Sequence, residues 1–365
     1  MKKRGLRRLC EKFGRVARRF ELLSLASLSL AFGGCTTTCG MESEKPGRPV
    51  TIVELVGTQH DTLPSTPNLE SILEKTRATE TGRGLLDFAA TNKVKITISD
   101  SKHMDANPND AILIRGLNHY TNIELNSEIG TEESMMLTLA HEIRHSWHKR
   151  VVKMGELNLD PKRSWISDRI QEADCFAYEI HFGYEYEKAT GKSLGLAASQ
   201  AGYGGLATFY AGLRDSGVAP QDAYRQLVER AFAHTHSLQY DDNFLDKQLK
   251  NWSAVVEKPF LGILYAKSWD DPTSAADFVK AMRHVTTVGT DTTKDLSALQ
   301  SWKDEDFTNL DKTGGAAKDD TEKLAKAEVK FGEARGAWKA HWQKTLDKIK
   351  EETRLRNISH GGPVR

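Results

Sequence analysis

The stretch that begins near Thr131 constrains the fold most, because it has the pattern of one uninterrupted amphipathic helix. Glu132 and Glu133 occupy its first turn, where the helix dipole favours negative charge. Apolar residues then recur at helical spacing and predict a stripe packed against a core: Met135, Met136, Leu139, Ala140, Ile143 and Trp147. The same helix carries the run His141-Glu142-Ile143-Arg144-His145.

Shorter, β-branched segments precede this helix, and longer helical ones follow it. Alternation and β-branching predict short strands at residues 50–57, 93–98, 111–115 and 121–125. A helical region over 68–92, interrupted near Thr81-Gly82, separates the first two. After the His-containing helix, a second strong helix is predicted over 164–189, ended by Gly191, and helical spacing continues to about residue 282. The sequence therefore predicts an α+β fold with a small mixed sheet and a mostly helical C-terminal half.

The first 34 residues have the features of an export signal. Nine Lys and Arg precede an uncharged run over residues 22–34, which is too short to span a bilayer as an ordinary helix. Cys35 follows directly, and the run Phe32-Gly33-Gly34-Cys35 resembles the lipobox of bacterial lipoproteins. That resemblance implies that Cys35 carries lipid and that the protein is anchored to a membrane of the cell envelope. The alternatives are a buried amphipathic N-terminal helix with an incidental Cys35 and, from Arg18-Arg19, twin-arginine export.

Charge and composition define the remaining organisation. Without the leader, 42 basic and 48 acidic residues remain, a balance that gives no electrostatic case for nucleic-acid binding. Residues 35–49, rich in Thr, Gly, Glu and Pro, predict a solvated tether. We expect a folded domain over 50–285, a linker or mobile loop over 286–320 and an amphipathic helix and tail over 321–365 that docks on the body or serves a partner.

The two histidines have the spacing of metal ligands. Two His four residues apart lie on one helix face, so both rings can reach one ion. Catalytic zinc takes three protein ligands and leaves a position for water. His141 and His145 fit this pattern, and Glu142 is placed to take a proton from a water on the ion. A surface helix with two solvated histidines is the alternative.

The third ligand is expected downstream. His148 would lie roughly 10 Å along the helix axis from His141, too far to share one ion. Glu172, on a separate predicted helix 27 residues after His145, is the better candidate. Asp174 lies about 200° around that helix from Glu172, which favours a supporting hydrogen-bond or packing role. Glu179 shares the Glu172 face and is the fallback ligand.

With these residues in view, the chain resembles the gluzincin type of metallopeptidase, and more closely a family of uncharacterised bacterial metallopeptidase domains. The resemblance rests on residues 139–147, on 169–174 and on 81–86, and it covers about 50–249. It implies a zincin-like fold in which His141, His145 and Glu172 bind Zn²⁺ and Glu142 is the catalytic base. Residue 176 is Phe, where thermolysin-like enzymes have an Asp, so the partner of a ligand His is unassigned.

These expectations converge on a zinc-dependent peptidase of the bacterial cell envelope that hydrolyses an unknown peptide or protein. The edge strand before the His-containing helix would bind the substrate backbone by strand addition. An oxyanion donor is not assigned among Tyr240, Tyr178, Tyr184 and His181. Cys175, within a helical pattern, is expected to be a small buried apolar residue. Two alternatives are a non-catalytic, zinc-stabilised interaction domain and a secreted effector protease, the second disfavoured by the lipobox.

Overall fold

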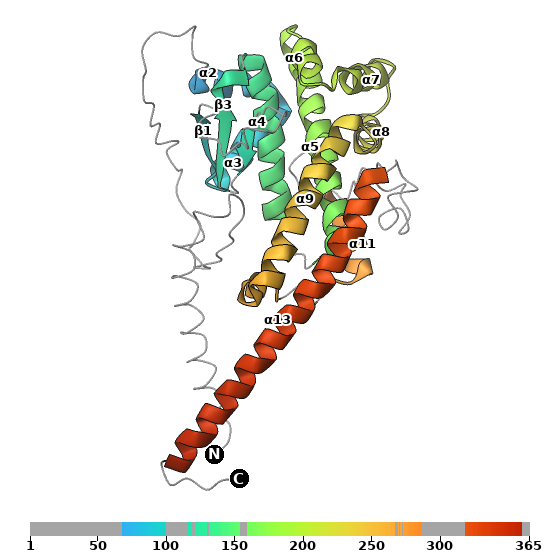
Figure 1. Cartoon of the computed structure of the whole chain (residues 1–365). Helices are drawn as coiled ribbons and strands as arrows, with labels where there is room; N and C mark the ends of the chain where they lie inside the picture. Colours follow the sequence, from blue (N-terminus) through green and yellow to red (C-terminus); the bar gives the residue numbers. More distant parts are fainter. Residues whose placement is uncertain are drawn as a thin grey trace.

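Two adjacent helices, α4 (Glu132–Trp147) and α5 (Pro161–Thr190), form the centre of the computed structural model, with the small sheet on the side of α4 that faces away from α5 (Figure 1). The structure describes residues 68–99, 116–118, 121–129, 131–153, 159–266, 269, 271, 273–285 and 318–359. The leader, Cys35, the tether, the predicted strands at 50–57 and 111–115, and residues 286–317 of the predicted linker lie outside this set.

The described strands form a small mixed sheet, as the sequence predicts. β1 (Lys95–Ser99) pairs in parallel with β3 (Asn122–Asn126), and β2 (Gly116–Asn118) pairs antiparallel with the other edge of β3. The strand that directly precedes α4 is therefore central rather than an edge strand, and β2 takes the edge beside α4. β1 begins two residues later than predicted because Lys93 has a left-handed backbone, with φ of 55°, directly after α3.

Two short helices lie before the sheet. α2 (Leu69–Thr76) and α3 (Glu80–Thr91) are separated at residues 77–79, slightly earlier than the predicted interruption at Thr81-Gly82. Thr79 sets this boundary, because its side chain accepts a hydrogen bond from the amide of Gly82 and caps α3. A Cβ at Gly82 would stand 1.8 Å from the carbonyl oxygen of Thr76, so glycine permits the close turn between the helices.

Capping residues define the ends of both central helices. Thr131 accepts a hydrogen bond from the amide of Ser134 and starts α4, which passes into a π-helical turn, η2 (His148–Val152). Asp160 caps α5, and Pro161 at the first helical position starts this helix three residues earlier than predicted. Gly191, with φ of 70°, ends it, as the sequence predicts.

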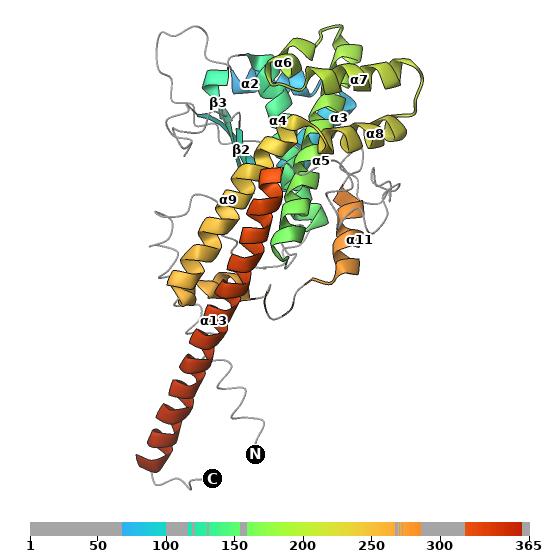
Figure 2. The same cartoon turned by 45° about the vertical axis from the view of Figure 1, so that its right-hand side comes forward.

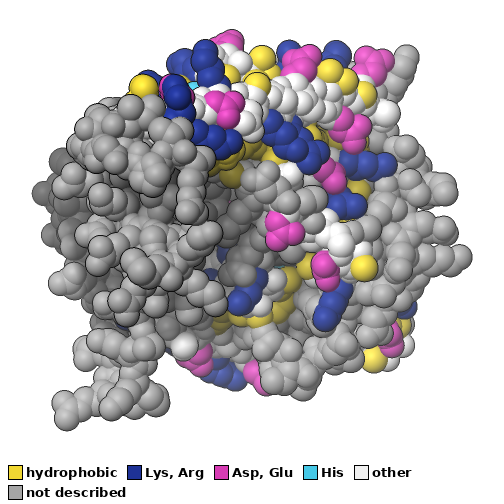
Figure 3. Space-filling model, turned by 90° about the horizontal axis from the view of Figure 1, so that it is seen from below, with side chains coloured by type: hydrophobic (Ala, Val, Ile, Leu, Met, Phe, Trp, Pro, Cys, Tyr) yellow, Lys and Arg dark blue, Asp and Glu magenta, His cyan; other side chains and the backbone are white. Residues whose placement is uncertain are grey.

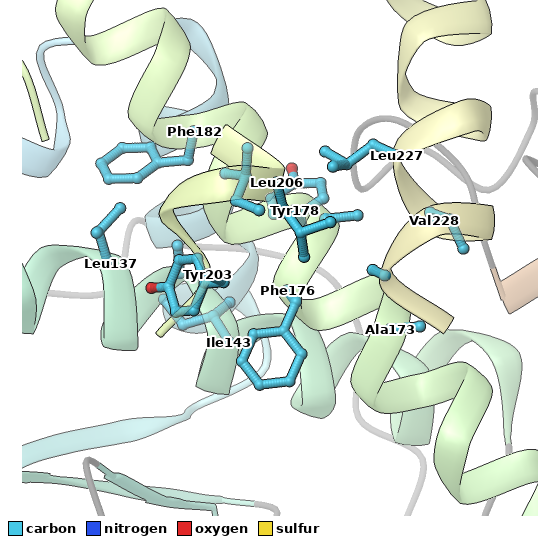
Figure 4. Packing of buried hydrophobic residues seen from close by; sticks show 14 of the residues in the cluster. Leu137, Ile143, Ala173, Phe176, Tyr178, Phe182, Tyr203, Leu206, Leu227 and Val228 are labelled. Carbon is cyan, nitrogen blue, oxygen red and sulfur yellow. The ribbon is translucent and has the colours of Figure 1, made fainter. Parts of the chain in front are cut away.

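The rest of the described chain is helical. It comprises α6 (Gly195–Gln200), α7 (Gly204–Asp215), α8 (Pro220–Phe232), α9 (Thr235–Glu257), η4 (Pro259–Tyr265), α11 (Ala275–Val285) and α13 (Lys318–Ser359). The main core joins α4 and α5 to α7 and α8, and Figure 4 shows Leu137 and Ile143 of α4 beside Phe176 and Tyr203. The α+β class is confirmed in this general sense.

Helix α13 packs along α9 and extends beyond the body in both views (Figures 1 and 2). It starts within the predicted linker range, three residues before the predicted helix. Its docked part joins a second apolar cluster built from Trp252, Val255, Trp269, Ala334 and Trp338. Seen from the end toward which α13 projects, basic, acidic and apolar side chains alternate on the described surface (Figure 3). Within the described ranges, no helix is long and apolar enough to cross a bilayer.

Candidate metal centre

The facing sides of α4 and α5 bring three of the predicted ligands together. His141 Nε2 lies 3.4 Å from Glu172 Oε2, and His145 Nε2 lies 3.3 Å from Glu172 Oε1. The two Nε2 atoms are 3.1 Å apart. Three side chains from two helices thus direct their donor atoms at a common point, although they are 31 residues apart in sequence at the extremes. The alternative of two solvated histidines on a surface helix is wrong, because both side chains are largely buried.

Glu179 contacts the His141 ring at Nδ1, the nitrogen that points away from Glu172. His141 Nδ1 lies 3.3 Å from Glu179 Oε2, and the hydroxyl of Tyr203 donates a hydrogen bond to Glu179 Oε1. A carboxylate at Nδ1 favours a proton there, which leaves Nε2 as the nitrogen that a cation beside Glu172 and His145 could bind. Glu179, two turns after Glu172, therefore takes the supporting role that the sequence left unassigned at Phe176. The Phe176 ring instead packs edge-on against His141, with the ring centroids 4.8 Å apart.

The electrostatics of the cluster suit a cation. Burial lowers the pKa of His141, but the carboxylates of Glu172 and Glu179 outweigh it and raise that pKa to about 10. Burial likewise raises the pKa of Glu172, but His145 and His141 hold it well below its usual range. Positive charge on His141 therefore stabilises the buried carboxylates of Glu172 and Glu179 when no other cation is bound.

The donor set fits zinc on chemical grounds. Two imidazole nitrogens and one carboxylate are a common ligand set for a catalytic zinc ion. Glu172 Oε2 is buried and makes no hydrogen bond of good geometry, although His141 Nε2 lies 3.4 Å away, so a cation bound between them would satisfy this oxygen better. His141 also has a carboxylate, Glu179, near its other ring nitrogen, as zinc-binding histidines commonly do.

The Glu142 side chain lies beside the sheet. A Cβ at Gly116 would lie 3.1 Å from both Cγ and Oε1 of Glu142, so the glycine of β2 makes room for this carboxylate. Asn118, two residues further along β2, donates hydrogen bonds to the carbonyl oxygen of Glu142 and to Ser146 Oγ. The edge strand is thereby attached to α4 beside the predicted base.

A buried polar network fixes α4 against α5 behind the cluster. The Asp174 carboxylate accepts hydrogen bonds from Arg144 Nε at 2.7 Å, from His148 Nε2 at 2.6 Å and from the Tyr224 hydroxyl at 2.7 Å. Arg144 also lies over the Trp147 ring, 3.9 Å from its centroid. Asp174 has the supporting role that the sequence predicts, and this network explains why Arg144 is tolerated inside the histidine motif.

His148 belongs to that network and not to the ligand cluster. Burial, opposed by Asp174, lowers the pKa of His148 to about 4, so its ring is neutral near pH 7. Its Nε2–H donates to Asp174, and Nδ1 lies 3.8 Å from the Sγ of Cys175. Among the described residues, Cys175 Sγ also lies within 4.8 Å of a ring nitrogen of both His141 and His145. Sequence reasoning missed this proximity, although Cys175 stands three residues after Glu172 and shares its helix face.

The candidate oxyanion donors have other partners or lie outside the described side chains. The Tyr184 hydroxyl donates to Asp215, His181 Nδ1 lies 2.8 Å from the Tyr210 hydroxyl, and the Tyr178 ring lies under Arg144. The side chain of Tyr240 is not among those that the structure describes. We therefore assign no oxyanion donor.

Comparisons with protein-family models, with curated proteins and with solved structures find no match to this chain. Function is therefore inferred from the residues and their geometry.

Proposed function

We propose that the protein is a zinc-dependent peptidase with a zincin-like arrangement, in which His141, His145 and Glu172 bind the ion. The convergence of these three side chains from α4 and α5 carries the proposal. The earlier resemblance to gluzincin-type metallopeptidases supports the same ligand set. Cys175 Sγ lies within 4.8 Å of a ring nitrogen of each histidine, and Glu179 lies beside the other nitrogen of His141.

When bound, zinc would polarise the substrate carbonyl and lower the pKa of a water molecule to about 7. Glu142 would take a proton from the attacking water as its oxygen adds to the peptide carbonyl carbon, and would pass that proton to the nitrogen as the C–N bond breaks. His141 would be held in one tautomer by Glu179. The contact between Gly116 and Glu142 supports this assignment, because it places the base beside the edge strand.

β2 is the element we propose for binding the substrate backbone. It stands at the edge of the described strands and is attached to α4 through Asn118. An extended peptide added to such an edge would be held by main-chain hydrogen bonds, which are independent of side-chain identity. The substrate class we propose is accordingly an extended peptide segment.

We further propose that lipid on Cys35 anchors the protein in the bacterial cell envelope. Cys35 lies outside the described residues, so the lipobox pattern alone supports this step. Labelling cells with a palmitate analogue tests it. Label should appear on the wild type and be lost in Cys35→Ala, and an unlabelled wild type would remove the anchor from the proposal.

Metal analysis tests the peptidase proposal. The purified chain should hold about one zinc, Glu172→Ala should bind zinc more weakly than the wild type, and Glu142→Gln should keep it. Glu187→Ala is the matched control, since Glu187 is an exposed carboxylate on the same helix. Retention of zinc by Glu172→Ala, with loss in Glu179→Ala, would show that Glu179 is the third ligand.

The rate of peptide hydrolysis distinguishes a peptidase from a non-catalytic, zinc-stabilised domain. Glu142→Gln should lower peptide hydrolysis by about 10²–10⁴-fold while zinc content is unchanged. A zinc-loaded protein whose Glu142→Gln variant equals the wild type on every protein substrate tried would instead be a non-catalytic, zinc-stabilised domain. Absence of zinc from every variant would refute the metal site itself.

A further inference from the structure

We propose that Cys175 is a fourth protein ligand of the ion and that its thiolate closes the coordination shell in the resting state. This inference rests on the proposed metal site of His141, His145 and Glu172. It goes beyond it by assigning a sulfur donor and a closed state that a three-ligand site would not have.

The placement of Cys175 on α5 is the first argument. Residues three apart on a helix are neighbours on one face, so Glu172 and Cys175 both face α4. On α4, His141 and His145 are likewise neighbours at a spacing of four. The two facing helices thus offer two donors each, and both Glu172 and Cys175 lie close to the two histidines.

The distances are the second argument. Cys175 Sγ lies within 4.8 Å of a ring nitrogen of each histidine. A tetrahedral zinc ion with ordinary Zn–N and Zn–S bonds holds N and S roughly 3.6 Å apart. A contraction of about 1 Å, within the reach of a side-chain rotation, would bring the sulfur into the shell.

The surroundings of the thiol are the third argument. Cys175 is fully buried and not in a disulfide. Cys175 Sγ also lies 3.8 Å from His148 Nδ1. The other ring nitrogen of His148 donates a hydrogen bond to Asp174, which fixes the position of the ring. The thiol therefore lies between the His148 imidazole and the two histidines of the ligand cluster. Thiolate is a strong zinc ligand in proteins, so a cysteine at this position can bind the ion.

Binding of Cys175 to the ion breaks one bond, forms another and releases one proton and one water. On closing, the S–H bond of Cys175 breaks and its proton passes to solvent, a bond from sulfur to the ion forms, and the water that otherwise fills this position leaves. On opening, the reverse occurs: the thiolate takes up a proton and a water enters. Four protein donors complete a tetrahedral shell, so attack on a substrate would require the open state.

Cobalt substitution of the full chain tests this directly, because a thiolate bonded to Co²⁺ gives an intense near-ultraviolet charge-transfer band. We expect this band in the wild type and its loss in Cys175→Ser, with cobalt still bound but at least about 10-fold more weakly. The chain has a further cysteine, Cys39, outside the described residues, and Cys39→Ser is the matched control that should keep the band. Cys175→Ala, with circular dichroism of each variant, separates loss of a ligand from loss of folding.

A small anion tests closure separately from ligation. Azide should change the visible cobalt bands of Cys175→Ser, where a position is open, and leave those of the wild type unchanged. An equal response of both proteins would overturn the closed state. Stoichiometric cobalt binding by the wild type without a charge-transfer band would overturn the role of Cys175 and leave the three-ligand site standing. Failure of the wild type to bind cobalt or zinc would overturn both.

Discussion

The α4–α5 pair and the α9–α13 pair are both helix pairs with buried interfaces, but they bury different chemistry. Between α4 and α5, ionisable groups meet ionisable groups: Arg144 with Asp174, and His141 and His145 with Glu172. Between α9, η4 and α13, the buried cluster is aromatic and aliphatic, centred on Trp252, Trp269 and Trp338. The first interface demands specific partners at specific positions, whereas the second needs only complementary shape. This difference agrees with a proposed metal site between α4 and α5, whereas the α9–α13 interface attaches the helix α13 to the body.

The largest expected effect comes from breaking the buried ion pair. Asp174→Ala leaves the fully buried Arg144 without its carboxylate, and we expect a loss of about 3–5 kcal/mol in the free energy of unfolding. Zinc affinity should fall as well, because Asp174 also anchors His148 and holds α4 against α5. Denaturant unfolding and zinc titration measure the two effects.

Asp215→Ala provides a matched comparison for this change. Asp215 also pairs with a cation and a tyrosine, Lys188 and Tyr184, but on the surface. Its removal should cost far less stability than the removal of Asp174 and leave zinc affinity unchanged. Equal costs for Asp174→Ala and Asp215→Ala would show that burial does not distinguish the two networks.

The next effect concerns the second helix pair. Trp338→Ala removes a ring that packs against Trp269, with centroids 6.0 Å apart, and should destabilise the docking of α13 by about 3 kcal/mol. Zinc affinity should stay within about 2-fold of the wild type, because distant sites act independently. Hydrogen exchange along α13 and a zinc titration would test both statements.

Trp342→Ala is the control for the aromatic cluster. Trp342 stacks on Trp338 but is 43% exposed, so its loss should cost clearly less. Trp338→Ala and Asp174→Ala are expected to differ in zinc affinity. If both lowered it equally, the two interfaces would contribute equally to the metal site, contrary to this prediction.

The sequence predicts the helices of the first pair better than their contacts. Apolar periodicity and caps predict α4 and α5, and the spacing of His141, His145 and Glu172 identifies donors on their faces. Periodicity describes one helix at a time, however, so it does not reveal which residues of α5 meet which residues of α4. That is why the pairing of Arg144 with Asp174, and of Glu179 with His141, becomes visible only after the helices pack.

Two further residues were missed for different reasons. Gly116 lies just beyond a predicted strand, and its role depends on the approach of Glu142 from another element. The helical pattern predicts a small buried apolar role for Cys175, and its burial agrees with this, but its spacing of three residues from Glu172 also places it on the face of the candidate ligands. The position of β2 at the sheet edge follows from strand order, which alternation within single strands does not determine.

The smallest expected effect lies at the periphery of the first pair, where Glu132 at the start of α4 is linked to α2. The carboxylate accepts hydrogen bonds from Lys75 and Ser71. The Lys75 hydrogen bond is the main reason that the pKa of Glu132 lies below its usual value, although partial burial opposes it. Both side chains are partly exposed, so we expect Glu132→Gln to cost less than about 1 kcal/mol, and less at high salt.

The pH dependence of this small effect has a definite sign. Because the pKa of Glu132 is lowered on folding, its contribution is fully present above the unfolded-state value of about 4.3 and is lost as pH falls through the folded-state pKa. The free-energy difference between the wild type and Glu132→Gln should therefore be constant near neutral pH and shrink below about pH 4. Glu133→Gln, in the same helical turn, controls for the helix dipole alone. Equal costs for the two variants would assign the effect to the dipole, and a cost that grows on acidification would refute the role of the Lys75 pair.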